Sequence, residues 1–465
     1  MVVQGAPTRA DFMGMGKIVF RRWDVEQGEL FPPAFKDLVP EGHLVHFVRR
    51  VVAEDLDLSA IYAKYTAAKG QPPYHPGLMT ALLLYGYSRG VYTSRKIEVA
   101  CEERLDFRAL VGSERPDHST IAEFRKRHRD GLATLFVQVL ALCRDAGMVK
   151  LGHVSLDGTK VGANASKHSA MSYRRMKEVE PKLAKEVEGW LDAAQKGDDA
   201  DDEEHGEDNR GDELPKHIQQ KIKKLAKIRA SMAELESEAE VEKERVETER
   251  AAKEAERGSR LPGRQPKALD GVPDDKAQRN FTDAESRIMK TANGYEQAYN
   301  AQAAVDAEYQ VIVAQDVTAK QNDHHELIPG VDQITANLGR PPEQVSADAG
   351  YCSEKNIEDL EERGIDAYIA TGRQKHGTPS PQGNEKSGKG PRAEGMRKKL
   401  QDGGWESPYR LRKHTVEPVF GQIKEARGFR RFLRRGLQNV KGEWTFLCTV
   451  HNLLKLAKRT AEPAV

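Results

Sequence analysis

A charge-dense stretch from about residue 177 to 270 divides the chain into two parts. It consists mainly of Glu, Lys, Asp and Ala, with an acidic block at 198–204. A segment with so few apolar residues cannot bury enough surface to build a core of its own. After Pro215, apolar residues recur at helical spacing, at Ile218, Ile222, Leu225, Met232 and Leu235. We therefore expect 177–270 to be a charged insertion, either disordered or helical, as a short coiled-coil arm or as a solvated helix that packs against nothing.

The overall composition narrows the class of protein. The 465 residues include 73 Lys and Arg against 72 Asp and Glu, so a net charge of +1 says nothing about a polyanionic partner. A chain of this length predicts two or more domains. The four cysteines have no paired spacing, which argues against a zinc site or a disulfide scaffold and suits a reducing cytosol. With no signal peptide and no stretch apolar enough to span a bilayer, we expect a cytoplasmic protein without a membrane partner.

The part of the chain before the charged stretch has helical patterning. Residues 1–17 are expected to be flexible, and 18–150 to form helices with capping residues such as Asp117. One of these helices ends in the basic run Arg125, Lys126 and Arg127. Short helices joined by tight turns, one with a basic face, suit an all-α domain that binds DNA in the manner of a helix-turn-helix. An ordinary helical bundle with a solvated basic face is the alternative.

Strands and helices alternate in the remaining segments, 151–176 and 271–465. Apolar runs predict strands at 151–161, 299–305, 310–317, 345–348 and 366–370. Helical patterns fall at 326–338, 354–363, 408–426 and 442–459. A turn at 306–309 joins two strands as a hairpin, and the stretch 374–392, rich in Gly, Ser, Pro and Lys, predicts a mobile loop. Parallel strands that alternate with helices indicate an α/β domain.

Three acids lie where such a domain can present side chains to one point. Asp157 lies in a short apolar strand, Asp348 ends another, and Glu417 lies in a helical segment. Clustered carboxylates repel one another unless cations neutralise them, and Mg²⁺ acting on phosphates requires hard oxygen ligands with open positions. Each acid alone also has an ordinary interpretation. Asp157 and Asp348 suit turns before a glycine, and Glu417 suits the start of a helix.

The sequence around these acids resembles bacterial insertion-sequence transposases with an Asp-Asp-Glu triad (DDE transposases). The match is strongest for the order Tyr409, then Arg412 or Lys413, then Glu417, then Lys424, which marks one branch of that family. Segments 74–76, 83–87, 117–121 and 293–302 are also similar to the family. The resemblance implies an RNase H-like catalytic domain in 151–176 and 271–465. It further implies that the catalytic residues Asp157, Asp348 and Glu417 hold Mg²⁺, or alternatively Mn²⁺.

Basic residues cluster after the third acid. Lys424 falls seven residues after Glu417, on the same helical face. Phe429 and Phe432 interleave with the basic residues up to 435, a pattern that suits contact with a DNA backbone. Tyr409 is expected either to stack on a base or to pack in the protein. The residues of this region that we expect to bind DNA are Tyr409, Arg412, Lys413, Lys424, Arg427, Arg430, Arg431 and Arg434.

The resemblance implies a DNA transposase that cleaves and joins strands at the terminal inverted repeats of its own element. Its partner would be double-stranded DNA, from both the element ends and the target. Because two ends must be joined together, a homodimer on DNA is expected. The protein would act in the bacterial cytoplasm, at the nucleoid. A nuclease of the same fold without strand joining, and a catalytically inactive DNA-binding protein derived from a transposase, are the alternatives.

Overall fold

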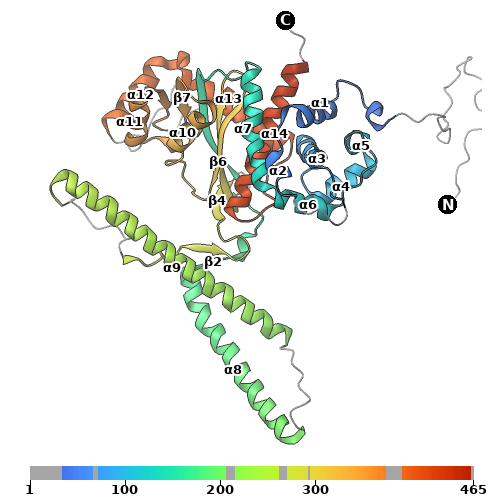
Figure 1. The fold of residues 1–465 in the computed structure, drawn as a ribbon. Coiled ribbons are helices and arrows are strands. Elements are labelled where there is room, and N and C mark those ends of the chain that lie inside the picture. The colour runs from blue at the N-terminus through green and yellow to red at the C-terminus, as the bar shows by residue number, and fades with distance from the viewer. Residues whose placement is uncertain are drawn as a thin grey trace, which may run out of the picture.

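The computed structural model describes residues 34–65, 72–205, 215–260, 270–291, 294–372 and 390–461, with side chains omitted at 194–205 and at 256. Figure 1 shows a body of helices around a sheet, from which a long pair of helices projects. Our expectations for residues 1–17 and for most of the loop 374–392 lie outside the described residues. Within the described residues, no helix is both long and apolar enough to cross a membrane.

Among the described residues, seven α-helices precede the sheet. They are α1 (Leu44–Arg50), α2 (Ser59–Tyr62), α3 (Pro76–Ser88), α4 (Ser94–Glu103), α5 (Leu105–Val111), α6 (His118–Arg127) and α7 (Arg129–Asp145). The expected cap at Asp117 is confirmed, because its carboxylate accepts hydrogen bonds from the first amides of α6. Short helical turns η1 (Phe35–Leu38) and η2 (Val51–Asp55) complete this region.

The sheet contains six strands of mixed direction. They are β1 (His153–Gly162), β4 (Arg287–Thr291), β5 (Gly294–Asp306), β6 (Ile312–Thr318), β7 (Gln344–Ala347) and β8 (Asp366–Ile369). Their order is β4-β5-β1-β7-β8, with β6 paired to β5. The predicted hairpin β5–β6 is confirmed as an antiparallel pair, and β1, β7 and β8 run parallel to one another. β4 was not predicted, since only Met289 of its five residues is buried and no alternating pattern marks it.

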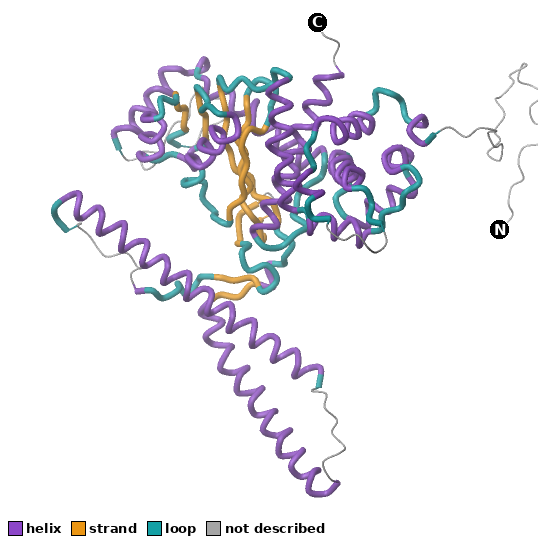
Figure 2. The backbone as a smooth tube through the Cα atoms, viewed as in Figure 1, coloured by secondary structure: helices purple, strands orange, loops and turns teal. Residues whose placement is uncertain are grey.

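Helices cover both faces of this sheet (Figures 1 and 2). They are α10 (Leu327–Leu338), α11 (Glu354–Glu362), α12 (Pro391–Gly403), α13 (Leu411–Gly421) and α14 (Leu437–Ala461). On one face, Gly330 of α10 lies so close to Leu156 of β1 that a Cβ there would be 2.7 Å from the Leu156 side chain. On the other face, the Trp444 indole of α14 donates a hydrogen bond to the Gln302 carbonyl of β5 (2.9 Å). The expected α/β architecture is therefore confirmed.

The N-terminal helices and the sheet share one hydrophobic core. A single cluster of buried side chains runs from α1 through α7 into the sheet and α14. α7 lies along α14, and the Cys143 thiol of α7 contacts the Asn452 carbonyl of α14 (3.6 Å). In the described residues, the helices expected to form a separate DNA-binding domain therefore pack as part of the same body as the sheet.

His451 of α14 is buried within this core and is held neutral. Its Nε2 is 2.9 Å from the Gln310 carbonyl and its Nδ1 is 3.4 Å from an Arg427 nitrogen. Burial, assisted by the charge of Arg427, lowers the pKa of His451 from 6.5 to about 3. Because the unfolded chain binds this proton more readily, stability should fall as the pH falls below 6.5. We expect His451 to cost about 2 kcal/mol of stability between pH 7 and pH 5.

Thermal denaturation of the wild type and of His451→Gln at both pH values measures this contribution. The variant should be less stable at pH 7 but should lose less stability on acidification. His168→Gln, which changes an exposed histidine, provides the control. An identical acid-induced loss in the wild type and in His451→Gln would contradict the prediction.

The charged insertion forms an extended helical arm. Helix α8 (Tyr173–His205) runs away from the body beyond a small ladder of β2 (Ala170–Ser172) and β3 (Gln278–Asn280), and α9 (Lys216–Arg257) returns beside it, passes the ladder and extends past it on the other side (Figure 1). The helical spacing predicted after Pro215 is confirmed for Ile218, Leu225 and Leu235, which are buried. A small cluster joins the two helices, formed by Tyr173, Met176, Leu183, Leu225, Ile228 and Leu235.

Candidate active site

The sheet register brings Asp157 and Asp348 side by side. The pairing of β1 with β7 ends at Leu156 opposite Ala347, and each acid is the next residue of its strand. Asp157 therefore lies at an edge of β1 that β7 leaves open, while Ala303 of β5 pairs with it on the other side. Asp348 begins the turn η5 (Ala349–Tyr351), where its Oδ1 accepts a hydrogen bond from the Gly350 amide (2.8 Å).

Helix α13 carries both Arg412 and Glu417, and Arg412 links Glu417 to Asp157. One guanidinium nitrogen of Arg412 is 2.7 Å from Asp157 Oδ2, and the other is 3.1 Å from Glu417 Oε1. The Arg412 and Asp157 side chains are only 13% and 15% exposed, whereas Glu417 is 48% exposed. A single buried cation of the chain itself thus bridges two of the three predicted acids.

The carboxyl groups of this site are buried close together, which disfavours their ionised forms. The pKa of Asp157 is raised to about 7, chiefly by desolvation, with Asp348 and Asp323 acting in the same direction and Arg412 opposing them. Burial likewise raises the pKa of Asp348. Carboxylate oxygens are the ligands that hard divalent cations bind, so the donor chemistry of the acids fits Mg²⁺ or Mn²⁺. Arg412 supplies the neutralising charge in this conformation, and no three acids of the described residues are arranged as ligands of one ion.

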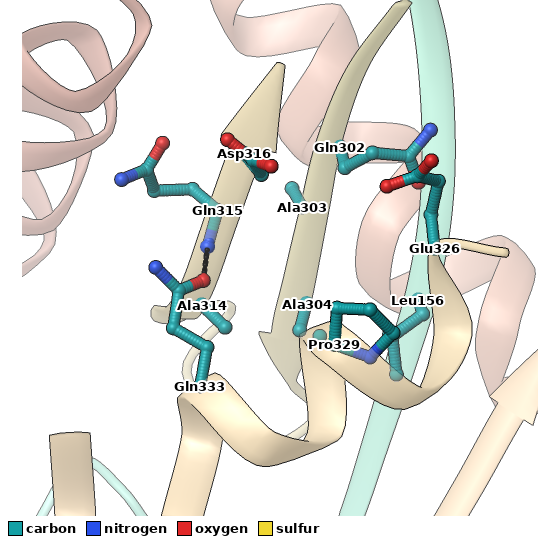
Figure 3. A pocket seen from close by; sticks show the side chains of 11 residues that line it. Leu156, Gln302, Ala303, Ala304, Ala314, Gln315, Asp316, Glu326, Pro329 and Gln333 are labelled. Atoms are coloured by element: carbon teal, nitrogen blue, oxygen red, sulfur yellow. Dashed lines mark hydrogen bonds between the residues drawn. The ribbon is translucent and has the colours of Figure 1, made fainter. Parts of the chain in front are cut away.

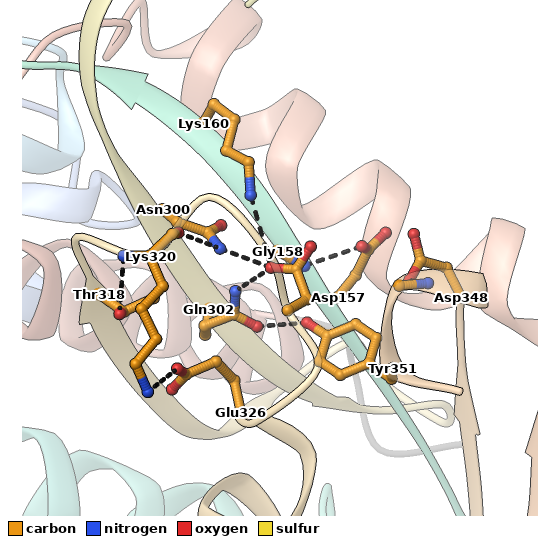
Figure 4. A network of polar contacts seen from close by, with 12 residues as sticks. Asp157, Gly158, Lys160, Asn300, Gln302, Thr318, Lys320, Glu326, Asp348 and Tyr351 are labelled. Carbon is orange, nitrogen blue, oxygen red and sulfur yellow. Dashed lines mark hydrogen bonds and ion pairs between the residues drawn. The ribbon is translucent and has the colours of Figure 1, made fainter. Parts of the chain in front are cut away.

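Asp323 is a fourth acid at the site and was missed from the sequence. It lies between β6 and α10, and its Oδ1 accepts hydrogen bonds from Asn300 Nδ2 (2.5 Å) and Gln302 Nε2 (2.7 Å). The Lys160 ammonium lies 3.5 Å from the same oxygen. Figure 4 shows these partners beside Asp157 and Asp348. These residues are far apart in sequence and meet only in the folded protein. The sequence around Asp323 by itself predicts only a polar turn.

Lys424 lies against the strand that carries Asp157. Its ammonium donates to Thr159 Oγ1 and to the Lys160 carbonyl, both at 2.8 Å. Helix α13 ends at Gly421 and continues as the wider turn η8 (Gln422–Ala426), which sets the position of Lys424. Burial lowers the pKa of Lys424. Lys413, four residues before Glu417, is exposed on α13.

Besides Arg412, three more of the arginines expected to bind DNA are partly buried. Arg125 donates to Tyr87 Oη, the Tyr92 carbonyl and Ser94 Oγ. Arg427 contacts the Gln422 carbonyl and His451. Arg434 is half-buried, and its amide donates to the buried carboxylate of Glu443 (3.2 Å). The exposed basic residues of the expected set are Lys126, Arg127, Lys413, Arg430 and Arg431.

The phenylalanines that interleave with the basic residues, Phe429 and Phe432, do not lie on the surface. Both are buried in the core, at 1% and 0% exposure, with ring centroids 5.6 Å apart. Their segment is extended and pairs with the end of β1, where the Phe432 amide donates to the Gly162 carbonyl (2.8 Å). Their rings pack against each other and against Tyr92 and Tyr299, so the two phenylalanines belong to the core. Tyr409 is also buried, and its ring packs 6.0 Å from the Arg412 guanidinium.

A separate cavity of about 310 Å³ lies between α10 and strands β5 and β6. Figure 3 shows Ala314, Pro329 and Gln333 in its wall, with the Gln333 side chain accepting the Gln315 amide (2.8 Å). None of the three predicted acids lines this cavity. The acids instead lie where the pairing of β1 with β7 ends.

Comparisons with known protein families agree with this geometry. A family model described as a transposase domain (DUF772) matches residues 33–127, and one described as a transposase DDE domain matches residues 260–453. The second match places the mixed sheet and its helices in the RNase H-like class of nucleic-acid-processing domains. The chain belongs to the insertion-sequence DDE transposases, a family of enzymes that cleave and join DNA. No curated protein and no solved structure gave a significant match.

Both Asp348 and Glu417 fall inside the matched DDE segment, but Asp157 lies outside both matched segments. Its selection therefore depends on the β1–β7 register and on the contact with Arg412. The Tyr–basic–Glu–Lys branch of the family stays a prediction.

Proposed function

We propose that this chain cleaves and joins phosphodiester bonds at the terminal inverted repeats of an insertion sequence, with Asp157, Asp348 and Glu417 as catalytic acids. One observation carries the proposal. Acids from a strand, from the end of its neighbour and from a helix meet beside one buried guanidinium. Buried like charges are costly in a purely structural role, and they are characteristic of sites that act on a charged ligand.

The three carboxylates would hold the divalent cations, Mg²⁺ or Mn²⁺. When bound, these ions activate the attacking oxygen and stabilise the leaving oxygen of the scissile phosphate. The chain itself contributes fixed positive charge through Arg412 and Lys424, close to where negative charge grows in the transition state. The hydrogen bonds of Lys424 to β1 hold its ammonium in place before DNA arrives.

Double-stranded DNA is the proposed substrate, both at the element ends and at the target. The exposed residues Lys126, Arg127, Lys413, Arg430 and Arg431 would contact its backbone. The buried or engaged residues Tyr409, Arg125, Arg427 and Arg434 would act indirectly, by holding these surfaces in place. A homodimer would join the two ends, and the reaction would take place in the bacterial cytoplasm at the nucleoid.

A strand-transfer assay with two end fragments, a supercoiled target and Mg²⁺ tests the proposal. Cleavage at the element ends followed by joining to the target supports a transposase. Cleavage without joining would instead favour a nuclease of the same fold. Specific binding of the ends with neither reaction would favour an inactive transposase-derived DNA-binding protein.

Lys424 is expected to influence the chemical step more than DNA binding. Replacement by alanine removes a positive charge fixed beside Asp157, so Lys424→Ala should slow cleavage about 10²-fold. A single-turnover cleavage assay beside a DNA-binding titration measures the two effects separately. The matched control is Lys413→Ala on exposed α13, which should weaken binding slightly and leave the cleavage rate of bound DNA unchanged. Equal losses of rate in both variants would contradict the prediction.

A further inference from the structure

The Asp323 carboxylate collects donors from the two central strands of the sheet. Lys160 of β1 pairs with Asn300 of β5, and Gly158 pairs with Gln302. The Asp323 Oδ1 atom is contacted by three side chains of these two residue pairs, those of Lys160, Asn300 and Gln302. An acid on a loop is thereby fixed against the same stretch of β1 that presents Asp157.

Two glycines leave the space that this carboxylate occupies. A Cβ on Gly158, the residue after Asp157, would lie 2.6 Å from Asp323 Oδ1 and 2.4 Å from Gln302 Nε2. A Cβ on Gly350 would lie 3.0 Å from Asp348 Oδ1 and 3.4 Å from Asp323 Oδ2. A side chain at Gly158 would collide with Asp323, whereas one at Gly350, two residues after Asp348, would press on Asp348 and only touch Asp323.

Gln302 connects Asp323 to the turn that carries Asp348. An ionised carboxylate only accepts hydrogen bonds, so Asp323 fixes the Gln302 amide with its nitrogen inward and its oxygen toward Tyr351. That oxygen accepts the Tyr351 hydroxyl, and Tyr351 is the fully buried last residue of η5. Figure 4 shows Gln302 and Tyr351 joined in this way beside Asp348.

A second contact ties the Asp323 loop to the same turn. Asn356 of α11 donates through Nδ2 to the His324 carbonyl (2.8 Å) and to the Tyr351 carbonyl (2.7 Å). The residue after Asp323 and the last residue of η5 therefore share one side-chain amide. Asp323, Gln302, Tyr351 and Asn356 form a continuous polar network behind Asp157 and Asp348.

We propose that Asp323 is a positioning residue of the active site, which sets the separation of the Asp157 and Asp348 carboxylates through Gln302 and Tyr351. The inference rests on the proposed function of these two acids. Groups that orient metal-binding side chains from behind typically change cation affinity or activity about 10-fold to 100-fold when they are replaced. Asp323 would orient both Asp157 and Asp348 in this way, although it is not one of the three predicted catalytic acids.

The test compares Asp323→Asn and Tyr351→Phe with the wild type. Both variants should require at least about 10-fold more Mn²⁺ for half-maximal binding by calorimetry, and a similar increase for cleavage. DNA binding should stay unchanged, because neither side chain is an exposed basic group. Asp332→Asn, which removes an exposed carboxylate of α10 that pairs with Arg363, is the matched control and should behave as wild type.

Wild-type Mn²⁺ affinity in a folded Asp323→Asn variant would overturn the proposal. If Asp323→Asn lowers the affinity but Tyr351→Phe does not, the route through Gln302 and Tyr351 is wrong. If Asp323→Asn fails to fold, Tyr351→Phe alone decides, since it removes only one hydroxyl. A wild-type protein that neither binds Mn²⁺ nor cleaves DNA would instead contradict the proposed function itself.

Discussion

The Asp157→Asn variant is expected to lose strand cleavage by about 10³-fold or more, because a cation effect of several kcal/mol on the transition state corresponds to a factor of this size. Asn keeps the shape of the side chain but removes the charge that would hold the cation at the edge of β1. DNA affinity should change little, because the exposed basic residues lie on other segments. Single-turnover cleavage and a binding titration with the same end fragment measure both quantities.

Asp316→Asn is the control for this substitution. Asp316 lies on β6 of the same sheet, is 47% exposed and pairs with Lys441, so its replacement should leave cleavage unchanged. A folded Asp157→Asn variant that loses cleavage and DNA binding to the same extent would show that Asp157 has a structural role. Retained cleavage would remove Asp157 from the proposed triad.

The positions of the triad could be predicted because each acid is marked by its own segment. Asp348 ends an apolar run, and β7 ends one residue before it. Glu417 lies in a helical pattern, and α13 covers it. Strands that alternate with helices predict a parallel α/β sheet. The proximity of Asp157 and Asp348 was implied only by the family resemblance and depends on the β1–β7 register.

Asp323 could not be predicted because its partners are distant in sequence. Its loop indicates a turn, while its donors Lys160, Asn300 and Gln302 belong to two other strands. The short strands β2, β3 and β4 were missed for a related reason. They are three to five residues long and pair through their backbones, so their side chains carry no clear alternation.

The basic cluster shows where composition misleads. Arginines that interleave with Phe429 and Phe432 suggest a nucleic-acid surface, but packing in the folded protein separates the two sets of side chains. Phe429 and Phe432 pack into the core, while Arg430 and Arg431 stay exposed. Arg125 was ambiguous for the same reason, since a half-buried arginine can satisfy its donors inside the protein.

Arg412 connects the electrostatics of the site to its stability, and its replacement should have a large effect. It bridges Asp157 and Glu417 from a buried position. Removing one partner of a buried ion pair leaves an uncompensated charge, so Arg412→Gln should destabilise the cation-free protein by about 3 kcal/mol. Added Mg²⁺ can neutralise the same carboxylates, so it should restore more stability to the variant than it adds to the wild type.

Thermal denaturation in EDTA and in Mg²⁺ measures both parts of this prediction. Arg410→Gln is the matched control, because Arg410 is exposed two residues earlier and its guanidinium donates to the Trp405 carbonyl. It should change neither the midpoint in EDTA nor its response to Mg²⁺. If Mg²⁺ stabilises Arg412→Gln no more than it stabilises the wild type, Arg412 and the cation do not compete for the same carboxylates. In that case Arg412 remains in place when the cation binds, and both positive charges would act on the phosphate together.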